Sequence, residues 1–298
     1  MKIYLLTICA MIIIIFTSCM DATSGRRFEK DYIVVAGSIY SGEPIYNYPL
    51  IIGKTSDLVN NLNLLDLVIL HADVTIEEVE SRDSTVLRFN LPKRGYVDET
   101  KAFIISAGKT YRLTVRIGDD VVWAQTTVPN EFELIDFQDS YTYDSDRLYF
   151  PKVIHSEIDL KHPLRMLVPN RRETQIRIEY FCLEEYEDAY IVYPFSDYLG
   201  DRPENKEDYD GNEYDPGFRK NIEISSLFPN EENIMTIPFH QLQFRFYGDH
   251  KITINIIDEN FYKYRYKSQG YFHGGISTGG IGYFGSATSH VVYTRVVR

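Results

Sequence analysis

Short apolar stretches separated by turn-forming residues fill the chain from Tyr32 onward, and their spacing constrains the fold most strongly. In residues 111–117, Tyr, Leu, Val and Ile alternate with Arg and Thr. Because successive side chains of a β-strand point to opposite faces, this alternation places one face in a core and the other in water. Gly118-Asp119-Asp120 then supplies the turn of a hairpin. Repeated short strands of this kind predict an all-β sandwich.

A proline marks the end of the first β unit. Pro129 follows a strand-like segment, and a proline in this position ends the hydrogen-bond ladder of a sheet. The sequence therefore predicts a β-sandwich over residues 32–129 and a second, larger β-rich domain over residues 130–298. In the second unit, residues 175–180 again alternate between apolar and polar side chains.

Two segments fit more than one kind of secondary structure. Residues 57–67 are rich in leucine and asparagine and suit either a single helix or a long loop. Residues 258–267 suit a strand with one aromatic and one basic face, or a helix that begins with Asp258 as its N-cap. Periodicity alone does not separate these alternatives.

Residues 1–18 have the layout of a bacterial signal peptide, with Lys2 before an apolar run and two small residues before Cys19. The run is shorter than the ~20 apolar residues that span a bilayer, so we expect it to be removed. The sequence Phe-Thr-Ser-Cys resembles a lipobox, which makes Cys19 the lipidated N-terminus of the mature chain. The small and polar residues 19–31 then form a lipidated, flexible tether.

Cysteine count and net charge narrow the possible partners. Cys9 leaves with the signal peptide and Cys19 takes the lipid, so the mature chain contains only Cys182 and no disulfide. We expect Cys182 to be a buried, inert thiol within an alternating strand. The net charge of -12 argues against nucleic acid, and against an anionic membrane surface, as a partner.

Tyrosines precede and enter an acidic stretch at residues 196–218, whose composition predicts a long exposed loop. Exposed tyrosines offer a broad contact surface at low entropic cost, which suits a protein or glycan partner. The alternative is that β-sheets simply favour tyrosine. The candidate contact residues are Tyr186, Tyr190, Tyr193, Tyr198, Tyr209 and Tyr214.

The same loop carries oxygen ligands at nearly alternating positions, as a calcium loop does. These residues are Asp208, Asp210, Asn212 and Asp215. Glu213 stands where an EF-hand loop needs glycine, so a solvated loop is the favoured interpretation and calcium a weak alternative. The histidines and cysteines show no zinc-binding spacing, and we expect no cofactor.

A glycine-rich segment at residues 270–285 contains two literal motif matches, one to a nucleophile elbow and one to a dinucleotide-binding fingerprint. Residues 275–279 fit Gly-x-Ser-x-Gly and residues 280–285 fit Gly-x-Gly-x-x-Gly. A nucleophile elbow needs a following helix, and a dinucleotide fingerprint needs a βαβ unit; the sequence indicates neither. We therefore expect a protein that is not an enzyme and has no catalytic residues.

Structural and binding interpretations of these glycines both remain open. Glycine lets the backbone approach another element closely, ahead of a terminal strand at residues 289–297 that we expect in the second sheet. Glycine-rich loops also approach ligands closely, which makes Gly279, Gly280 and Gly282 candidate ligand contacts.

Several features together resemble a known family. They are the lipobox, the segments 108–115 and 124–129, the sequence Phe261-Tyr262-Lys263-Tyr264, and residues 279–285. This combination resembles Bacteroidota outer-membrane lipoproteins that carry a domain of unknown function and are often encoded beside TonB-dependent receptors. The resemblance implies an immunoglobulin-like or transthyretin-like N-terminal domain, a larger β domain behind it, and no established catalytic residues.

Two hypotheses of different class remain for the function. The first is an accessory or binding lipoprotein of the outer membrane, with a TonB-dependent receptor as its partner. The alternative is a fimbrillin-like structural or adhesive subunit, for which Arg26-Arg27 would be the processing site. In both, the lipid on Cys19 attaches the chain to the membrane. Whether the chain faces the periplasm or the cell surface is left open.

Overall fold

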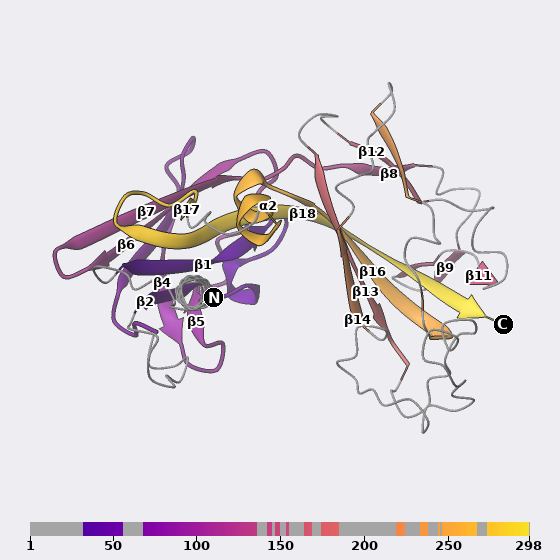
Figure 1. The fold of residues 1–298 in the computed structure, drawn as a ribbon, viewed down its shortest axis with the longest axis horizontal. Helices are drawn as coiled ribbons and strands as arrows, with labels where there is room; N and C mark the ends of the chain where they lie inside the picture. The colour runs from indigo at the N-terminus through magenta and orange to yellow at the C-terminus, as the bar shows by residue number, and fades with distance from the viewer. Residues whose placement is uncertain are drawn as a thin grey trace, which may run out of the picture.

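In the computed structural model, strands dominate the described residues and helices are short (Figure 1). The predicted all-β fold is thereby confirmed. Among these residues, no helix is both long enough and apolar enough to cross a bilayer. Segment 57–67, left open between helix and loop, lies outside them. The described residues are 32–55, 68–135, 142–144, 147–149, 153–154, 164–168, 174–184, 219–223, 233–237, 244, 246–266 and 273–297.

Two layers of strands enclose a first core. One layer is a five-stranded sheet in the order β5 (Gly95–Val97), β4 (Ser84–Asn90), β3 (Asp73–Glu78), β6 (Thr110–Ile117), β7 (Asp120–Thr127). The other layer consists of β2 (Ile51–Lys54), β1 (Ile33–Tyr40) and the beginning of β18 (Gly280–Val297). The 3-10 helix η1 (Ile45–Asn47) lies between β1 and β2 in the chain.

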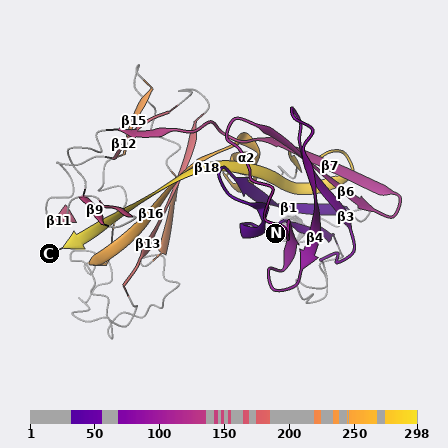
Figure 2. The same cartoon turned by 180° about the vertical axis from the view of Figure 1, so that it is seen from behind.

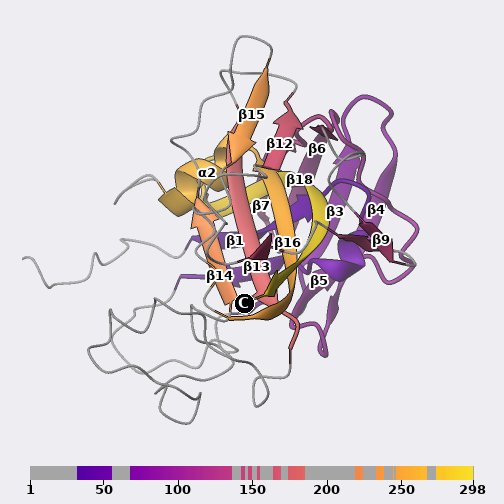
Figure 3. The ribbon, with the colours of Figure 1, turned by 90° about the vertical axis from the view of Figure 1, so that its right-hand side faces the viewer.

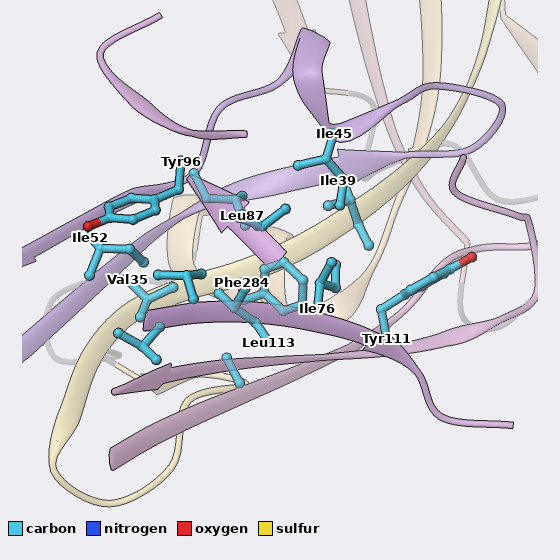
Figure 4. Packing of buried hydrophobic residues seen from close by; sticks show 14 of the residues in the cluster. Val35, Ile39, Ile45, Ile52, Ile76, Leu87, Tyr96, Tyr111, Leu113 and Phe284 are labelled. Carbon is cyan, nitrogen blue, oxygen red and sulfur yellow. The ribbon is translucent and has the colours of Figure 1, made fainter. Parts of the chain in front are cut away.

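Apolar side chains from both layers fill this core (Figure 4). Val35 and Phe284 come from one layer and Leu113 from the other, and all three are buried. Burying one such side chain stabilises the fold by roughly 1.5–3 kcal/mol, which is an upper estimate for a compact unfolded chain. The alternation predicted for residues 111–117 is confirmed, because the apolar positions of β6 point inward and β6 pairs with β7 through a tight hairpin.

A second core lies between a long sheet and a small one (Figure 3). Its apolar contacts include Met166 and Met235 of the small sheet and Ile178 and Ile252 of the long one. The long sheet contributes β13 (Gln175–Cys182), β14 (Arg219–Glu223), β16 (Gly248–Ile257) and the end of β18; the small sheet is β15 (Ile234–Ile237), β12 (Leu164–Leu167), β8 (Glu133–Ile135). The remaining short strands are β9 (Thr142–Asp144), β10 (Arg147–Tyr149), β11 (Val153–Ile154) and β17 (His273–Gly274).

Strand β18 runs through both halves of the molecule (Figures 1 and 2). Its residues 280–287 pair in parallel with β1, and its residues 287–296 pair antiparallel with β16. The terminal strand expected at 289–297 in the second sheet is thus present, but it begins nine residues earlier, at Gly280. The boundary near residue 129 stays a prediction, and the structure adds that Phe284 of β18 belongs to the first core.

The pairing of β18 with β1 depends on a glycine. Gly282 has φ of +105°, and a Cβ atom built there would lie 2.1 Å from the carbonyl oxygen of Val35. This overlap is with backbone, which cannot move aside as a flexible side chain can. A close backbone approach therefore explains Gly282, in agreement with the structural interpretation of the glycine-rich segment.

We expect Gly282→Ala to lower the free energy of unfolding by more than about 3 kcal/mol, because it adds a backbone overlap to an unfavourable φ. Gly118→Ala is the matched control, since Gly118 also has positive φ (+59°) but has no atom within 4 Å of the added Cβ. The control should cost only about 1 kcal/mol. Urea unfolding monitored by fluorescence measures both values, and equal losses would contradict the explanation.

Candidate binding surface

The helix α2 (Glu259–Tyr266) resolves the ambiguity of residues 258–267. Asp258 is its N-cap, because its Oδ1 accepts a hydrogen bond from the backbone N–H of Phe261 at 3.0 Å. Glu259 in the first turn and Lys263 one turn later form an ion pair, and both charges suit the helix dipole. The helical alternative is therefore correct, and its capping residue is the one that the sequence indicated.

The Asp258 carboxylate also ties α2 to strands β7 and β18. Its Oδ1 accepts the backbone N–H of Ser286 at 3.0 Å, and its Oδ2 accepts the hydroxyl of Thr126 at 2.7 Å. The hydroxyls of Thr126 and Ser286 lie 2.8 Å apart. Burial raises the pKa of Asp258 above its ordinary value, and these hydrogen bonds offset only part of that rise. We call this group the Asp258 junction.

Further hydrogen bonds extend the same junction. The Asn260 amide donates to the carbonyl oxygens of Gln125 and Phe284, at 2.8 and 3.1 Å. The Thr288 hydroxyl donates to the carbonyl oxygen of Pro129 at 2.5 Å. Side chains from α2 and β18 thus bind the backbone at the end of β7, which fixes the position of the helix.

Small residues on β18 allow α2 to lie close to the strand. A Cβ atom on Gly285 would come within 2.8 Å of the Phe261 Cβ, and Ala287 packs against Phe261 in a small apolar cluster. Phe261 in turn stacks on Tyr283 of β18, and Tyr264 stacks on the same ring, with centroids 5.8 and 4.4 Å away. The helix therefore gathers aromatic rings over the middle of β18.

A second pair of rings lies beside this group. Tyr40, the last residue of β1, packs against Tyr48 with ring centroids 4.0 Å apart. Arg177 of β13 lies with its guanidinium 5.5 Å from the centre of the Phe261 ring, and it pairs with Glu179. We define the junction surface as Tyr40, Tyr48, Arg177, Glu179, Tyr264 and Tyr283, over the buried Phe261.

Burial affects the phenols of Tyr40 and Tyr48 in this surface. Burial raises the pKa of Tyr40 to about 12, with a smaller opposing effect from Arg177. Burial, followed by the charges of Glu43 and Glu179, raises the pKa of Tyr48 as well. Both hydroxyls are therefore available as hydrogen-bond donors at neutral pH rather than as bases.

The composition of the junction surface suits recognition. Tyr48 and Tyr264 are 37% and 38% exposed, and a tyrosine side chain combines an apolar ring with a hydroxyl group. Glu179 and Arg177 add one charge of each sign beside the rings. Such a mixture of aromatic and polar groups can stack on and hydrogen-bond to a peptide or a sugar. None of the described residues of this surface forms a nucleophile–base pair.

The glycines proposed as ligand contacts lie in the turn before β18 and in the strand itself. Gly279 sits in the turn with φ of +97°, Gly280 begins β18 and packs near Val122, and Gly282 approaches β1. Ser277, the central residue of the Gly-x-Ser-x-Gly match, accepts the backbone N–H of Trp123 at 3.0 Å through its hydroxyl. The turn therefore covers the edge of β7, and the geometry of a nucleophile elbow is absent from these described residues.

Most of the other predicted site residues fall outside the described part of the chain. These are the lipidation residue Cys19, the calcium candidates Asp208, Asp210, Asn212 and Asp215, and the tyrosines Tyr186, Tyr190, Tyr193, Tyr198, Tyr209 and Tyr214. Within the described residues, no three His, Cys, Asp or Glu side chains lie together as metal ligands. Cys182 is buried as predicted, and burial raises its pKa to about 12.

Sequence reasoning missed the tyrosines of the junction surface. Tyr40 and Tyr48 lie on either side of a turn, and Tyr283 lies inside the glycine motif, far away in the chain. Only the parallel pairing of β1 with β18 brings them together. Tyr264 was part of an aromatic segment noted in the sequence, but its contact with Tyr283 required the helical conformation.

Fold and surface define an all-β protein in which one strand joins two cores and an aromatic surface lies at the junction. A family model described as "Domain of unknown function (DUF4249)" matches residues 20–291, and the chain belongs to this family. The predicted membership of a family with a domain of unknown function is thereby confirmed. Bacteroidota origin and a neighbouring TonB-dependent receptor stay predictions.

No curated protein matches this chain. One similar solved structure comes from a study titled "Structural insight into host cell surface retention of a 1.5-MDa bacterial ice-binding adhesin". It is 9% identical with a TM-score of 0.18, and the match covers 91% of this chain and 66% of that chain. Similarity at this level defines neither a shared fold nor a shared role.

The raised pKa of Asp258 predicts a pH dependence of stability. Its folded pKa lies above its unfolded pKa, so the folded state binds the proton more tightly. The contribution of Asp258 to stability is therefore greatest below the unfolded pKa and falls as pH rises through the folded pKa. Asp258→Asn, which cannot titrate, should lack this contribution. We expect wild type to gain stability relative to Asp258→Asn as pH falls from 7 toward 3.

Urea unfolding of both proteins across this pH range measures the difference. Asp249→Asn serves as a control, since Asp249 pairs with Arg295 on the other half of β18 and does not belong to the junction. A difference between wild type and Asp258→Asn that stays constant with pH, or that shrinks toward acid, would contradict the assigned sign.

Proposed function

We propose that this chain is a non-catalytic binding lipoprotein, anchored in the outer membrane through Cys19, that serves as an accessory component of a TonB-dependent receptor system. The observation that supports this proposal most strongly is the junction surface. Its exposed tyrosines lie near Arg177, and tyrosine and arginine are both enriched where proteins meet partners. The partner that we assign to it is the receptor itself.

The rigidity of the surface supports the same proposal. Asp258 and Asn260 fix α2 against β7 and β18 by hydrogen bonds to backbone and side-chain groups of these two strands. Tyr264 and Tyr283 are held in place because their rings stack on one another. A partner that binds such a surface loses little entropy in ordering it, so the binding energy of the rings is retained.

The proposal predicts that two exposed rings carry much of the receptor contact. The double change Tyr48→Ala and Tyr264→Ala removes both while leaving the buried Phe261 in place. Each buried aromatic contact at an interface contributes on the order of 2 kcal/mol, so we expect the amount of co-purified receptor to fall by about tenfold or more. Affinity purification of the lipidated protein from detergent-solubilised outer membrane, with quantitative mass spectrometry, measures this.

Val86→Ala is the control, because Val86 is 56% exposed on the five-stranded sheet, away from the junction surface. It should leave receptor capture unchanged. Equal capture by wild type and the double variant would remove the junction surface from the proposal. Recovery of wild type without any β-barrel receptor would overturn the accessory role itself.

The fimbrillin-like alternative makes a different prediction for the same purification. A polymerising subunit would give laddered species with new N-termini after Arg26 or Arg27. Strand β1 is hydrogen-bonded along both edges, to β18 and to β2, and it buries Val35 and Ile39 in the first core. Replacement of β1 by a strand of another subunit during assembly would have to break its hydrogen bonds to both β18 and β2. We therefore favour the accessory role.

A further inference from the structure

Two lysine ammonium groups meet at the ring of Tyr46, away from the junction surface. The Nζ atom of Lys101 lies 4.2 Å from the ring centroid, and the Nζ atom of Lys93 lies 4.7 Å from it. Tyr46 belongs to η1, Lys93 to the turn between β4 and β5, and Lys101 to the segment after β5. Three separate segments of the first half thus bring a phenol and two positive charges together.

Polar side chains fix the two segments that carry the lysines. Asp98, which is 1% exposed, accepts hydrogen bonds from the Thr100 hydroxyl at 2.7 Å and from the backbone N–H of Phe103 at 3.0 Å. The backbone N–H of Lys101 bonds to the carbonyl oxygen of Asp98. On the other side, the Asn90 side chain accepts the backbone N–H of Lys93 at 3.1 Å. Hydrogen bonds therefore hold the backbone in place at both lysines.

The backbone at this place is strained. Lys101 has φ of +58° and Arg94, next to Lys93, has φ of +54°. Glycine normally occupies this left-handed region, as Gly42 and Gly118 do in this chain. Only four non-glycine residues of the described chain have positive φ, and two of them are Lys101 and the residue that follows Lys93. Strain of this kind concentrates at ligand-binding positions.

The positive charges here are not neutralised by the protein. Among the described residues, neither Lys93 nor Lys101 has a carboxylate oxygen within 4.0 Å, and the Tyr46 hydroxyl has no hydrogen-bond partner. Glu43, close by in sequence, accepts the side-chain amide of Asn47 at 2.6 Å instead. Cation–π attraction holds each ammonium near the ring, but the two ammonium groups repel one another. An anion bound beside the ring would offset this repulsion.

We propose that Tyr46, Lys93 and Lys101 form a binding site for a phosphate group. The two ammonium groups provide the charge and several N–H donors, and the phenol provides an O–H donor, which is the set that a phosphate monoester uses. Inorganic phosphate, a sugar phosphate and a phospholipid headgroup all present this chemistry. The site does not depend on the proposed receptor contact, and it places a positive patch on a chain whose net charge is -12.

The first test is calorimetric titration of the lipidated, detergent-solubilised protein with inorganic phosphate, at constant ionic strength set by sodium chloride. Lys93→Gln with Lys101→Gln should weaken binding by about tenfold or more, since it removes two charge-assisted contacts. Lys54→Gln, which changes another exposed lysine on β2, should bind as wild type does. Tyr46→Phe keeps the ring and both cation–π contacts but lacks the hydroxyl, and should bind several-fold more weakly.

A parallel titration distinguishes the sources of the phosphate. Phosphatidic acid is added to the detergent micelles, with phosphatidylcholine, whose phosphate is a shielded diester, as the comparison. Binding of inorganic phosphate supports a soluble phosphate or sugar phosphate as the ligand. Binding of phosphatidic acid alone supports a lipid headgroup. If neither binds, or if Lys93→Gln with Lys101→Gln binds as tightly as wild type while thermal unfolding shows all variants folded, the proposal is wrong.

Discussion

The structure depends on the backbone pairing of a single long strand. β18 bonds in parallel to β1 in its first half and antiparallel to β16 in its second, so one strand satisfies the hydrogen bonds of both parts of the molecule. The apolar residues of that strand follow the same division, since Phe284 enters the first core and Val292 the second. Relative movement of the two cores would therefore require a bend or a break in β18.

The Asp258 junction holds the aromatic surface against the continuous strand β18. A buried carboxylate that caps α2 and also binds β7 and β18 leaves the helix a single orientation. Its burial raises its pKa, which shows that the arrangement carries an electrostatic cost that a purely apolar contact would avoid. The carboxylate instead fixes the orientation of the helix, because each of its oxygens accepts hydrogen bonds from particular donors.

Local patterns predicted local structure well. The alternation of residues 111–117, the hairpin turn at Gly118 and the N-cap at Asp258 were all readable because they depend on neighbours in the chain. The tyrosines of the junction surface were not, since Tyr40 and Tyr283 meet only through parallel pairing across most of the sequence. The glycines near residue 280 indicated that another part of the backbone approaches them closely, but they do not identify the strand that does so.

The order in which the chain is made gives β18 a kinetic role. Ile33 pairs with Gly280, so the first core lacks its closing strand until the segments that build β8 to β16 have been synthesised. Contacts of such long range form slowly, and a chain that lacks them stays incompletely folded. A chain that crosses a membrane through a narrow channel must be unfolded while it does so. A fold that needs its C-terminal strand to close its first core is completed late. An exported chain with this fold would therefore stay unfolded, and able to pass through a channel, until most of it has crossed the membrane.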